Sequence, residues 1–433
     1  MFARRIAVVG TGYVGLTTGA CLASLGHRVV CADVDALKVA RLRAGQVDIL
    51  EPGLAELVTQ GMAAGRLEFV VGAREAVEDA EVVFLCLPTP MGAGGAADLS
   101  AVESVAAEVR EILPYGCVVV CKSTVPVGTS QRVAKLLNRE DVAVVSNPEF
   151  LREGTAVRDF LHPDRIVVGS DSSQAAERVG ALFAKLGAPT VLTDAASSEM
   201  VKYAANCFLA MKLSYVNAVS ELCELLGADV ASVCEGMGYD RRIGQSFLKP
   251  GPGWGGSCLP KDTHAMVQIA EAVGVDFSLI KATIEANTRQ QHRVVAKIRQ
   301  AVGGDLAGAR IGLLGLAFKA GTNDLRDSPA LAVAELLAFE GADLTAYDPE
   351  ISRPLAGMRV VDDPHQAVTG AAAVVLLTDW PVFRTLDWAL IAELMDGRTV
   401  LDTRNHLDPD ALERAGLLLQ GAGRMPVRSN TIG

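Results

Sequence analysis

Apolar residues follow two kinds of pattern along the chain. In the first half, short apolar runs rich in β-branched residues alternate with stretches whose apolar residues recur at helical spacing. Several runs are continuously apolar, which is typical of strands buried on both faces, and strands separated by helices form parallel sheets. The strands predicted here are Arg5–Val9, Arg28–Ala32, Val82–Leu87, Cys117–Lys122, Val142–Ser146 and Arg165–Gly169.

The pattern changes near Asp194. From Ser197 to about Gly227 the apolar positions keep a helical period without an internal proline or glycine. They predict one helix of ~31 residues, ~46 Å long at 1.5 Å per residue. Ser197 or Ser198 is expected to cap this helix, with Glu199 in its first turn. A helix of this length typically bridges domains or builds an oligomer interface.

A second alternation of strands and helices begins near Gly303. The strands predicted there are Arg310–Leu314, Asp343–Tyr347, Ala373–Leu377 and Thr399–Asp402. The glycines of Arg310-Ile-Gly312-Leu-Leu-Gly315 could form a nucleotide-binding turn or a packing turn, and their spacing leaves both open. The tail after Leu419 is polar and is expected to be poorly ordered. The fold class is therefore α/β, with two Rossmann-like parallel-sheet domains joined by a central long-helix domain.

Composition and charge exclude several classes of function. The chain has 433 residues, half of them apolar, which is enough for two or three domains. Its 40 basic and 51 acidic residues give a net charge of −11, which argues against nucleic acid or an anionic membrane as a partner. No apolar run approaches the ~18–20 residues of a membrane span. The four apolar residues before Gly10 fit a strand better than a signal peptide.

The cysteine pattern indicates a reducing compartment. Nine cysteines are an odd number, and several of them lie within apolar strand-like runs. Small buried thiols of this kind are typical of a cytoplasmic protein. Six scattered histidines and the lack of a CxxC pair give no metal-ligand spacing, so no metal site is predicted.

A glycine-rich turn follows the first predicted strand. In Gly10-Thr-Gly12-Tyr-Val-Gly15 the first glycine allows a tight turn, the second lets a pyrophosphate approach, and the third lets the next helix pack closely. Asp33 ends the second strand, where a carboxylate binds an adenosine ribose and repels a 2′-phosphate. The pattern predicts a dinucleotide site that prefers NAD to NADP. A tight turn without a ligand is the alternative.

Cys258 has different surroundings from the other cysteines. It follows the glycine-dense segment Pro250–Gly256. Pro260 suits the first turn of a helix, so the thiol is expected near a helix N-terminus with Lys261 close by. Both features favour the thiolate, which is the nucleophilic form of cysteine. A structural cysteine in a flexible loop is the alternative that these residues leave open.

Further polar clusters lie at the ends of predicted strands and on the long helix. Ser123–Thr129 and Asn147–Glu153 each follow a strand, where α/β proteins form their sites. Lys202 and Asn206 are four residues apart and share one helical face. Each cluster also has an ordinary explanation as turn chemistry or solvated surface.

Six segments together resemble one known family. GTGYVGL, STVPVGT, NPEFLREG, KYAAN, FLKPGPGWGGSCLPKD and GLAFKAGTNDLRDSP occur in the order found in the UDP-glucose/GDP-mannose dehydrogenases. The resemblance runs from about residue 5 to about residue 405, and the GGSCxPKD segment is specific. The element Asp240-Arg-Arg242-Ile243-Gly244 resembles the members that act on UDP-glucose.

The resemblance implies oxidation of the C6 alcohol of UDP-glucose to the acid, with two NAD⁺ reduced. Cys258 matches the nucleophile that carries the sugar as a thiohemiacetal and then as a thioester. The other matching catalytic positions are an oxyanion-stabilising pair, Lys202 and Asn206, two holders of the catalytic water, Asp262 and Thr124, and the general base, Glu153.

The resemblance also implies binding residues and an assembly. Positions that match the NAD site are Gly10, Gly12, Val14, Gly15, Asp33, Lys38, Thr89, Thr124, Glu153, Lys261 and Arg326. Positions that match the UDP-sugar site are Phe150, Leu151, Arg152, Glu153, Lys202, Arg242, Phe247, Leu248, Lys249, Pro250, Gly251, Gly255 and Lys319. Arg242 matches an arginine that reaches a neighbouring subunit, so a homodimer or higher homo-oligomer is expected. The implied domains are an NAD domain (1–195), a central dimerisation domain (196–302) and a UDP-sugar domain (303–433).

Three alternatives stay open from the sequence. The same four-electron chemistry could act on GDP-mannose or another UDP-hexose. A non-catalytic sensor of NAD or of a nucleotide sugar would keep the binding motifs. A two-electron alcohol dehydrogenase with a structural Cys258 would release one NADH per substrate.

Overall fold

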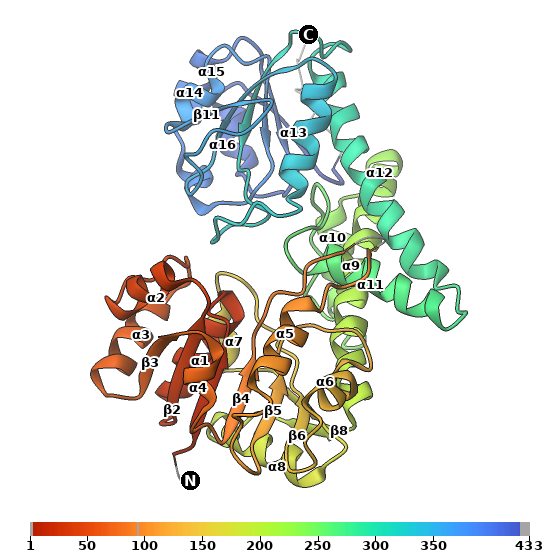
Figure 1. Cartoon of the computed structure of the whole chain (residues 1–433). Coiled ribbons are helices and arrows are strands. Elements are labelled where there is room, and N and C mark those ends of the chain that lie inside the picture. Colours follow the sequence, from red (N-terminus) through yellow and green to blue (C-terminus); the bar gives the residue numbers. More distant parts are fainter. Residues whose placement is uncertain (1–2, 93–94, 425–433) are drawn as a thin grey trace, which may run out of the picture. The chain divides into compact units, whose positions relative to one another are not determined.

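The computed structural model describes residues 3–92 and 95–424 (Figure 1). They divide into two compact units. The first is built from residues 3–92, 95–205 and His264–Val275, and the second from Asn206–Thr263 and residues 276–424. No helix in the described part of the chain is long and apolar enough to cross a membrane.

The first unit contains an eight-stranded sheet of order β3-β2-β1-β4-β5-β6-β7-β8. Its strands are β1 (Arg5–Val9), β2 (Arg28–Asp33), β3 (Leu67–Val71), β4 (Val82–Leu85), β5 (Val118–Cys121), β6 (Ala143–Ser146), β7 (Ile166–Gly169) and β8 (Thr190–Thr193). Neighbouring strands pair in parallel, except that β6 and β7 pair antiparallel. The α/β class and the mainly parallel sheet predicted from the sequence are confirmed.

Helices cover both faces of this sheet (Figure 1). Ile6 and Val8 of β1 point into one core, whereas Ala7 and Val9 point into the other, because successive side chains of a strand alternate. The helices of the first core are α1 (Tyr13–Ser24), α2 (Ala36–Arg43), α3 (Leu54–Ala63), α7 (Ala156–Leu161) and α8 (Ser173–Leu182). Those of the second are α4 (Ala73–Val77), α5 (Ser100–Val109) and α6 (Thr129–Leu137). A short 3₁₀ helix, η2 (Ala184–Leu186), precedes β8.

The predicted long helix is present as α9 (Ala195–Leu226). Its N-cap differs from the prediction, because Asp194 rather than a serine caps it. The Asp194 carboxylate accepts the backbone N–H of Ser197 at 2.8 Å. The expectation that Glu199 lies in the first turn is also wrong, because the helix begins at Ala195 and its first turn holds no acidic residue. Glu199 is buried and accepts hydrogen bonds from the N–H and hydroxyl of Ser130. Asp194 is the residue that precedes this earlier start, and aspartate is a favoured N-cap residue.

The second unit combines helices with a six-stranded parallel sheet of order β11-β10-β9-β12-β13-β14. After α9 come α10 (Val230–Gly238), α11 (Leu259–Ala272), which continues into the first unit, and α12 (Ser278–Ala301). The strands are β9 (Arg310–Leu314), β10 (Asp343–Tyr347), β11 (Arg359–Val361), β12 (Ala373–Leu376), β13 (Thr399–Asp402) and β14 (Leu418–Gly421). The remaining helices are α13 (Pro329–Phe339), α14 (Pro364–Val368), η3 (Pro381–Thr385), α15 (Trp388–Leu394) and α16 (Pro409–Arg414).

The structure decides two expectations for this unit, the role of the glycine turn after β9 and the order of the chain after Leu419. A Cβ at Gly312 would lie 2.6 Å from the Ala367 carbonyl oxygen, and one at Gly315 would overlap Thr378. Protein atoms therefore fill the space beside these glycines, and the turn after β9 is a packing turn. The expected disorder after Leu419 is wrong up to Arg424, because β14 pairs with β13 through Gly421. Residues 425–433 lie outside the described part.

We expect alanine to act differently at two glycines of the turn after β1. A Cβ at Gly15 would overlap the Gly10 carbonyl oxygen, whereas one at Gly12 would meet no atom within 4 Å. Gly15→Ala should lower the free energy of unfolding by about 3 kcal/mol. Gly12→Ala should change it by less than about 1 kcal/mol. Thermal unfolding of both variants checks this, and equal melting temperatures would contradict it.

Candidate functional site

The dinucleotide turn has the geometry that its sequence predicts. Gly10 adopts φ +95°, and a Cβ there would overlap the Cys86 carbonyl oxygen. Val14, in the first turn of α1, packs on the first core. The backbone is thus pressed against the end of β4 on one side, while the space beside Gly12 is open. An open backbone at a helix N-terminus is suited to a pyrophosphate.

Asp33 is fixed at the end of β2 by three neighbours. Its carboxylate accepts the Thr11 N–H at 3.0 Å and the Thr11 hydroxyl at 2.5 Å, and it forms an ion pair with Lys38 at 3.1 Å. Burial raises the pKa of Asp33, but hydrogen bonds from Thr11, the Asp35 N–H and Lys38 outweigh it and lower the pKa to about 2. The carboxylate is therefore ionised, and Lys38 is its counter-ion.

Thr89 and Thr124 meet at the carboxyl ends of neighbouring strands. Thr89 is buried and its hydroxyl donates to the Thr124 carbonyl oxygen at 2.9 Å. Both residues therefore lie on the edge of the sheet that carries the dinucleotide turn, as their NAD-site assignment predicts.

A buried ion pair lies beyond β6. The Lys202 ammonium donates to the Glu149 carboxylate at 2.8 Å and to the Glu149 carbonyl oxygen at 2.7 Å. Only 4% of the Lys202 side chain and 6% of the Glu149 side chain are exposed. Burial raises the pKa of Glu149, but the charge and hydrogen bond of Lys202 outweigh it, and the pKa is lowered. The Glu149 carboxylate is therefore ionised.

Sequence reasoning gave Glu149 no role and chose Glu153 four residues later. In the structure Glu153 is half-buried, and the N–H of the next residue, Gly154, donates to the Tyr13 hydroxyl in the dinucleotide turn at 2.6 Å. Glu149 therefore pairs with Lys202, whereas Glu153 lies beside the dinucleotide turn. A signal was available, since Glu149 is the first carboxylate after the buried strand.

A cavity of about 400 Å³ opens beside the same segment. Phe150 lies between two cations, with the Arg165 guanidinium 3.6 Å and the Lys202 ammonium 5.4 Å from its ring centroid. Arg152 is exposed and forms an ion pair with Asp159 at 2.5 Å. The cavity is lined by the predicted substrate residues Phe150, Leu151 and Arg152, and also by Lys122, Asn147 and Glu149. The ammonium of Lys122, which the sequence did not single out, donates to Asn147 at 3.0 Å, and burial lowers its pKa to about 8.

Cys258 lies immediately before α11, in the second unit. Its carbonyl oxygen accepts the Asp262 N–H at 2.9 Å, the first helical hydrogen bond, so Cys258 occupies the N-cap position. Its thiol lies 3.7 Å from the Ser257 hydroxyl. The other eight cysteines are buried, whereas Cys258 is partly exposed. The predicted position at a helix N-terminus is confirmed.

Asp262 joins two other predicted residues. It is fully buried, and its carboxylate accepts the Asn206 amide at 2.6 Å and the Lys261 ammonium at 2.5 Å. Asn206, Asp262 and Cys258 all belong to the second unit. Lys202 lies on α9 one turn before Asn206 and is counted with the first unit.

The segment before Cys258 packs closely on the loop between β9 and α13. A Cβ at Gly255 would overlap the Asp327 carbonyl oxygen, and one at Gly256 would lie 2.7 Å from the Phe318 ring. Lys319 places its ammonium 5.4 Å from the same ring centroid. The remaining predicted residues of this segment differ in exposure: Leu248, Pro250 and Gly251 are buried, Phe247 is half-buried with φ +63°, and Lys249 is exposed.

Arg404 is a cation that sequence reasoning missed. Its guanidinium donates to the Leu377 carbonyl oxygen at 3.0 Å, and a Cβ at Gly251 would lie 2.9 Å from it. Burial lowers the pKa of Arg404. Its position just after β13 was the available signal.

Two predicted arginines lie at the surface of the second unit. Arg242 forms an ion pair with Asp240 at 2.6 Å, and 89% of its side chain is exposed. Arg326 is exposed and forms an ion pair with Asp324 at 2.7 Å. Among the described residues, no group of three or more histidine, cysteine or carboxylate side chains could hold a metal ion.

Comparison with known proteins gives a consistent family. Three family models match: the NAD binding domain of the UDP-glucose/GDP-mannose dehydrogenase family over residues 4–187, its central domain over 196–289 and its UDP binding domain over 312–409. The chain is 43% identical to a UDP-glucose 6-dehydrogenase of Rhizobium meliloti, with 97% of this chain and 99% of the relative covered. It is 42% identical to one of Bacillus subtilis, with 98% and 94% covered.

Solved structures agree. A UDP-glucose dehydrogenase from Pyrobaculum islandicum has a TM-score of 0.90 at 36% identity, with 98% of each chain covered. A UDP-D-ManNAc dehydrogenase from Pyrococcus horikoshii has a TM-score of 0.87 at 30% identity, with 97% of this chain and 99% of that chain covered. The chain therefore belongs to the UDP-glucose/GDP-mannose dehydrogenase family, and it is an NAD-dependent nucleotide-sugar dehydrogenase with a UDP-sugar as its substrate.

Proposed function

We propose that this chain oxidises UDP-glucose to UDP-glucuronate and reduces two NAD⁺. The observation that carries the proposal is the partly exposed Cys258 thiol at the N-cap of α11, with Asn206 and Asp262 hydrogen-bonded in the same unit. The relatives named UDP-glucose 6-dehydrogenase support UDP-glucose as the sugar nucleotide.

NAD⁺ accepts a hydride in each of the two oxidations. The first converts the C6 alcohol to an aldehyde. The Cys258 thiolate then adds to the aldehyde carbon and forms a thiohemiacetal, which still carries the hydrogen that the second oxidation removes. The resulting thioester is hydrolysed by water, which releases the acid and restores the thiol. Lys202 and Asn206 supply the positive charge and the amide donor suited to the alkoxide that develops.

Glu149 is our candidate for proton transfer in place of Glu153. The Glu149 carboxylate is bonded to Lys202, so the proton of an alcohol held by Lys202 has an acceptor within hydrogen-bond reach. Glu153, beside the dinucleotide turn, then serves the cofactor site. Thr124 and Asp262 remain the proposed holders of water.

The three-domain division at 1–195, 196–302 and 303–433 and a homodimer belong to the same proposal. Support for the dimer comes from α9, where Phe208, Tyr215 and Leu222 recur every seven residues and are each more than half exposed. Apolar residues at this spacing form a continuous stripe on a helix, which is typical of a surface that another helix covers. Location in the cytoplasm is proposed from the cysteine pattern alone.

The yield of NADH tests the chemistry. With limiting UDP-glucose and excess NAD⁺, we expect two NADH per sugar, and little NADH from GDP-mannose or a UDP-N-acetylhexosamine. Cys258→Ala should still bind UDP-glucose but release no UDP-glucuronate, because the thioester cannot form. One NADH per sugar would contradict the role of Cys258, and turnover of another sugar alone would change the substrate.

Charge-neutral variants test the two glutamates. We expect Glu149→Gln to lower kcat by about 100-fold or more, since general acid–base catalysis contributes at least that much. Glu153→Gln should mainly raise the KM for NAD⁺ and lower kcat less than tenfold. Steady-state kinetics with UDP-glucose gives both constants, and thermal unfolding controls for stability. The reverse order of effects would return the general base to Glu153.

Asp33→Asn tests the preference for NAD. The substitution removes the charge that repels a 2′-phosphate and frees Lys38 to bind one. Because a charged hydrogen bond contributes about 1.5–3 kcal/mol, kcat/KM with NAD⁺ should fall by about tenfold or more, and the ratio to NADP⁺ should fall further. Asp35→Asn is the control, since the Asp35 side chain caps α2 and the substitution keeps the backbone N–H that bonds Asp33. An unchanged cofactor ratio in Asp33→Asn would contradict this role.

A further inference from the structure

The segment that leads to Cys258 is held by amide side chains from two helices. Asn287, on α12, accepts the Trp254 N–H at 2.8 Å and donates to the Trp254 carbonyl oxygen at 2.9 Å. Gln290, one turn later, donates to the Gly251 carbonyl oxygen at 2.8 Å. From α9, Asn217 accepts the Gly251 N–H at 2.9 Å. Both polar groups of two backbone residues are therefore bonded to side chains.

These contacts are buried. Asn287, Gln290 and Asn217 are each less than 9% exposed, and Trp254 is 5% exposed. The indole N–H of Trp254 also donates to the Ser214 hydroxyl at 2.9 Å. Buried amides that have lost these partners would each cost about 1–3 kcal/mol, so the segment is strongly tied to one conformation.

The glycine pattern matches this arrangement. Gly253 has φ +134°, and a Cβ there would lie 2.9 Å from the Asn287 amide oxygen. Gly255 and Gly256 press against Asp327 and Phe318. The glycines of the segment are thus in close contact with α12 and with the loop before α13, and Cys258 follows two residues after Gly256.

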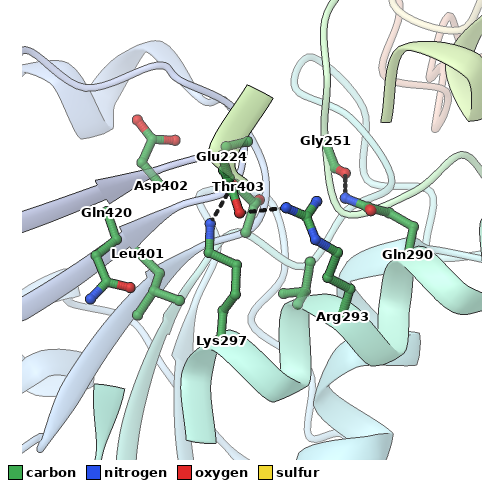
Figure 2. A pocket seen from close by; sticks show the side chains of 11 residues that line it. Glu224, Gly251, Gln290, Arg293, Lys297, Leu401, Asp402, Thr403 and Gln420 are labelled. Carbon is green, nitrogen blue, oxygen red and sulfur yellow. Dashed lines mark hydrogen bonds and ion pairs between the residues drawn. The ribbon is translucent and has the colours of Figure 1, made fainter. Parts of the chain in front are cut away.

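The helix that carries Asn287 and Gln290 is itself anchored (Figure 2). One turn beyond Gln290, Arg293 forms an ion pair with Glu224 near the end of α9. Lys297 bonds Glu224 at 2.8 Å and the Gly421 carbonyl oxygen of β14 at 2.9 Å. Figure 2 shows Arg293 and Lys297 converging on Glu224 while Gln290 reaches the backbone of Gly251. One face of α12 therefore connects the sheet, α9 and the segment before Cys258.

We propose that Asn287 and Gln290 are positioning residues for the Cys258 nucleophile, with Asn217 as their partner on α9. They fix the backbone of Gly251 and Trp254, and so set where the thiol lies at the N-cap of α11. The inference rests on the proposed function for its catalytic consequence. The structural part of the inference does not depend on the substrate: Asn287 controls the accessibility and orientation of the Cys258 thiol.

The test replaces one atom. Asn287→Asp keeps the acceptor for the Trp254 N–H but places a carboxylate oxygen against the Trp254 carbonyl oxygen, where the amide now donates. The matched control is Gln300→Glu, the same amide-to-acid change at an exposed position of α12. Two quantities are measured: the rate at which iodoacetamide labels Cys258 across pH, read from its peptide by mass spectrometry, and kcat and KM with UDP-glucose and NAD⁺.

We expect Asn287→Asp to change the labelling rate of Cys258 at least fivefold or to shift its pH midpoint. A displacement of the thiol of about 1 Å should lower kcat by about 10- to 100-fold. The KM for NAD⁺ should stay within about twofold, as a positioning role of this kind predicts. Gln300→Glu should match the wild type. If Asn287→Asp labels and turns over like the control, or loses only melting temperature, the proposal is overturned.

Two further results keep the outcomes distinct. If Asn287→Asp does not fold, Gln290→Glu removes the donor to Gly251 alone, and the same labelling change is required of it. If the wild-type protein does not oxidise UDP-glucose, the proposed function fails, but the labelling rates still decide whether Asn287 positions Cys258.

Discussion

The second unit is organised by one constraint: the segment before Cys258 has no strand or helix to satisfy its backbone. Pro250–Gly256 contains four glycines, so its conformational freedom before folding is large. Its buried N–H and C=O groups need partners, because an unpaired one costs about 1–3 kcal/mol. Side chains of α9 and α12 supply those partners, and the walls around the glycines exclude other conformations. The path of the backbone that leads to Cys258 is thereby held by residues distant in sequence.

Three carboxylates predicted or observed near the candidate sites are each paired with a lysine of the same chain. Asp33 with Lys38, Glu149 with Lys202, and Asp262 with Lys261 are each joined within about 3 Å, and the last two carboxylates are almost wholly buried. Burying an unpaired charge is costly, so pairing offsets part of that cost and orients these side chains.

Much of the fold could be predicted because buried parallel strands are continuously apolar. β1, β9, β10 and β13 have the predicted bounds, whereas β3, β8, β11 and β14 were missed. The reasons are physical: β8 is exposed, β11 has three residues, and β3 and β14 carry polar residues as edge or near-edge strands. Whether such a segment forms an edge strand depends on tertiary packing, and the apolar periodicity of the sequence does not predict it.

The local geometry of two motifs was predicted from the sequence, whereas contacts that depend on the path of an irregular backbone were not. The glycine turn and the N-cap position of Cys258 are local, so sequence located them. Glu149 and Glu153 are four residues apart on irregular backbone. The path of that backbone pairs Glu149 with Lys202 and places Glu153 beside Tyr13, and the sequence does not predict that path. Asn287 and Gln290 left a fainter signal. Two amides three residues apart occupy buried positions of a helix that also buries Val294 and Ile298. Buried polar side chains need hydrogen-bond partners. The glycine-rich segment before Cys258 has backbone groups that no strand or helix satisfies, so it is the segment that these two amides would be expected to bind.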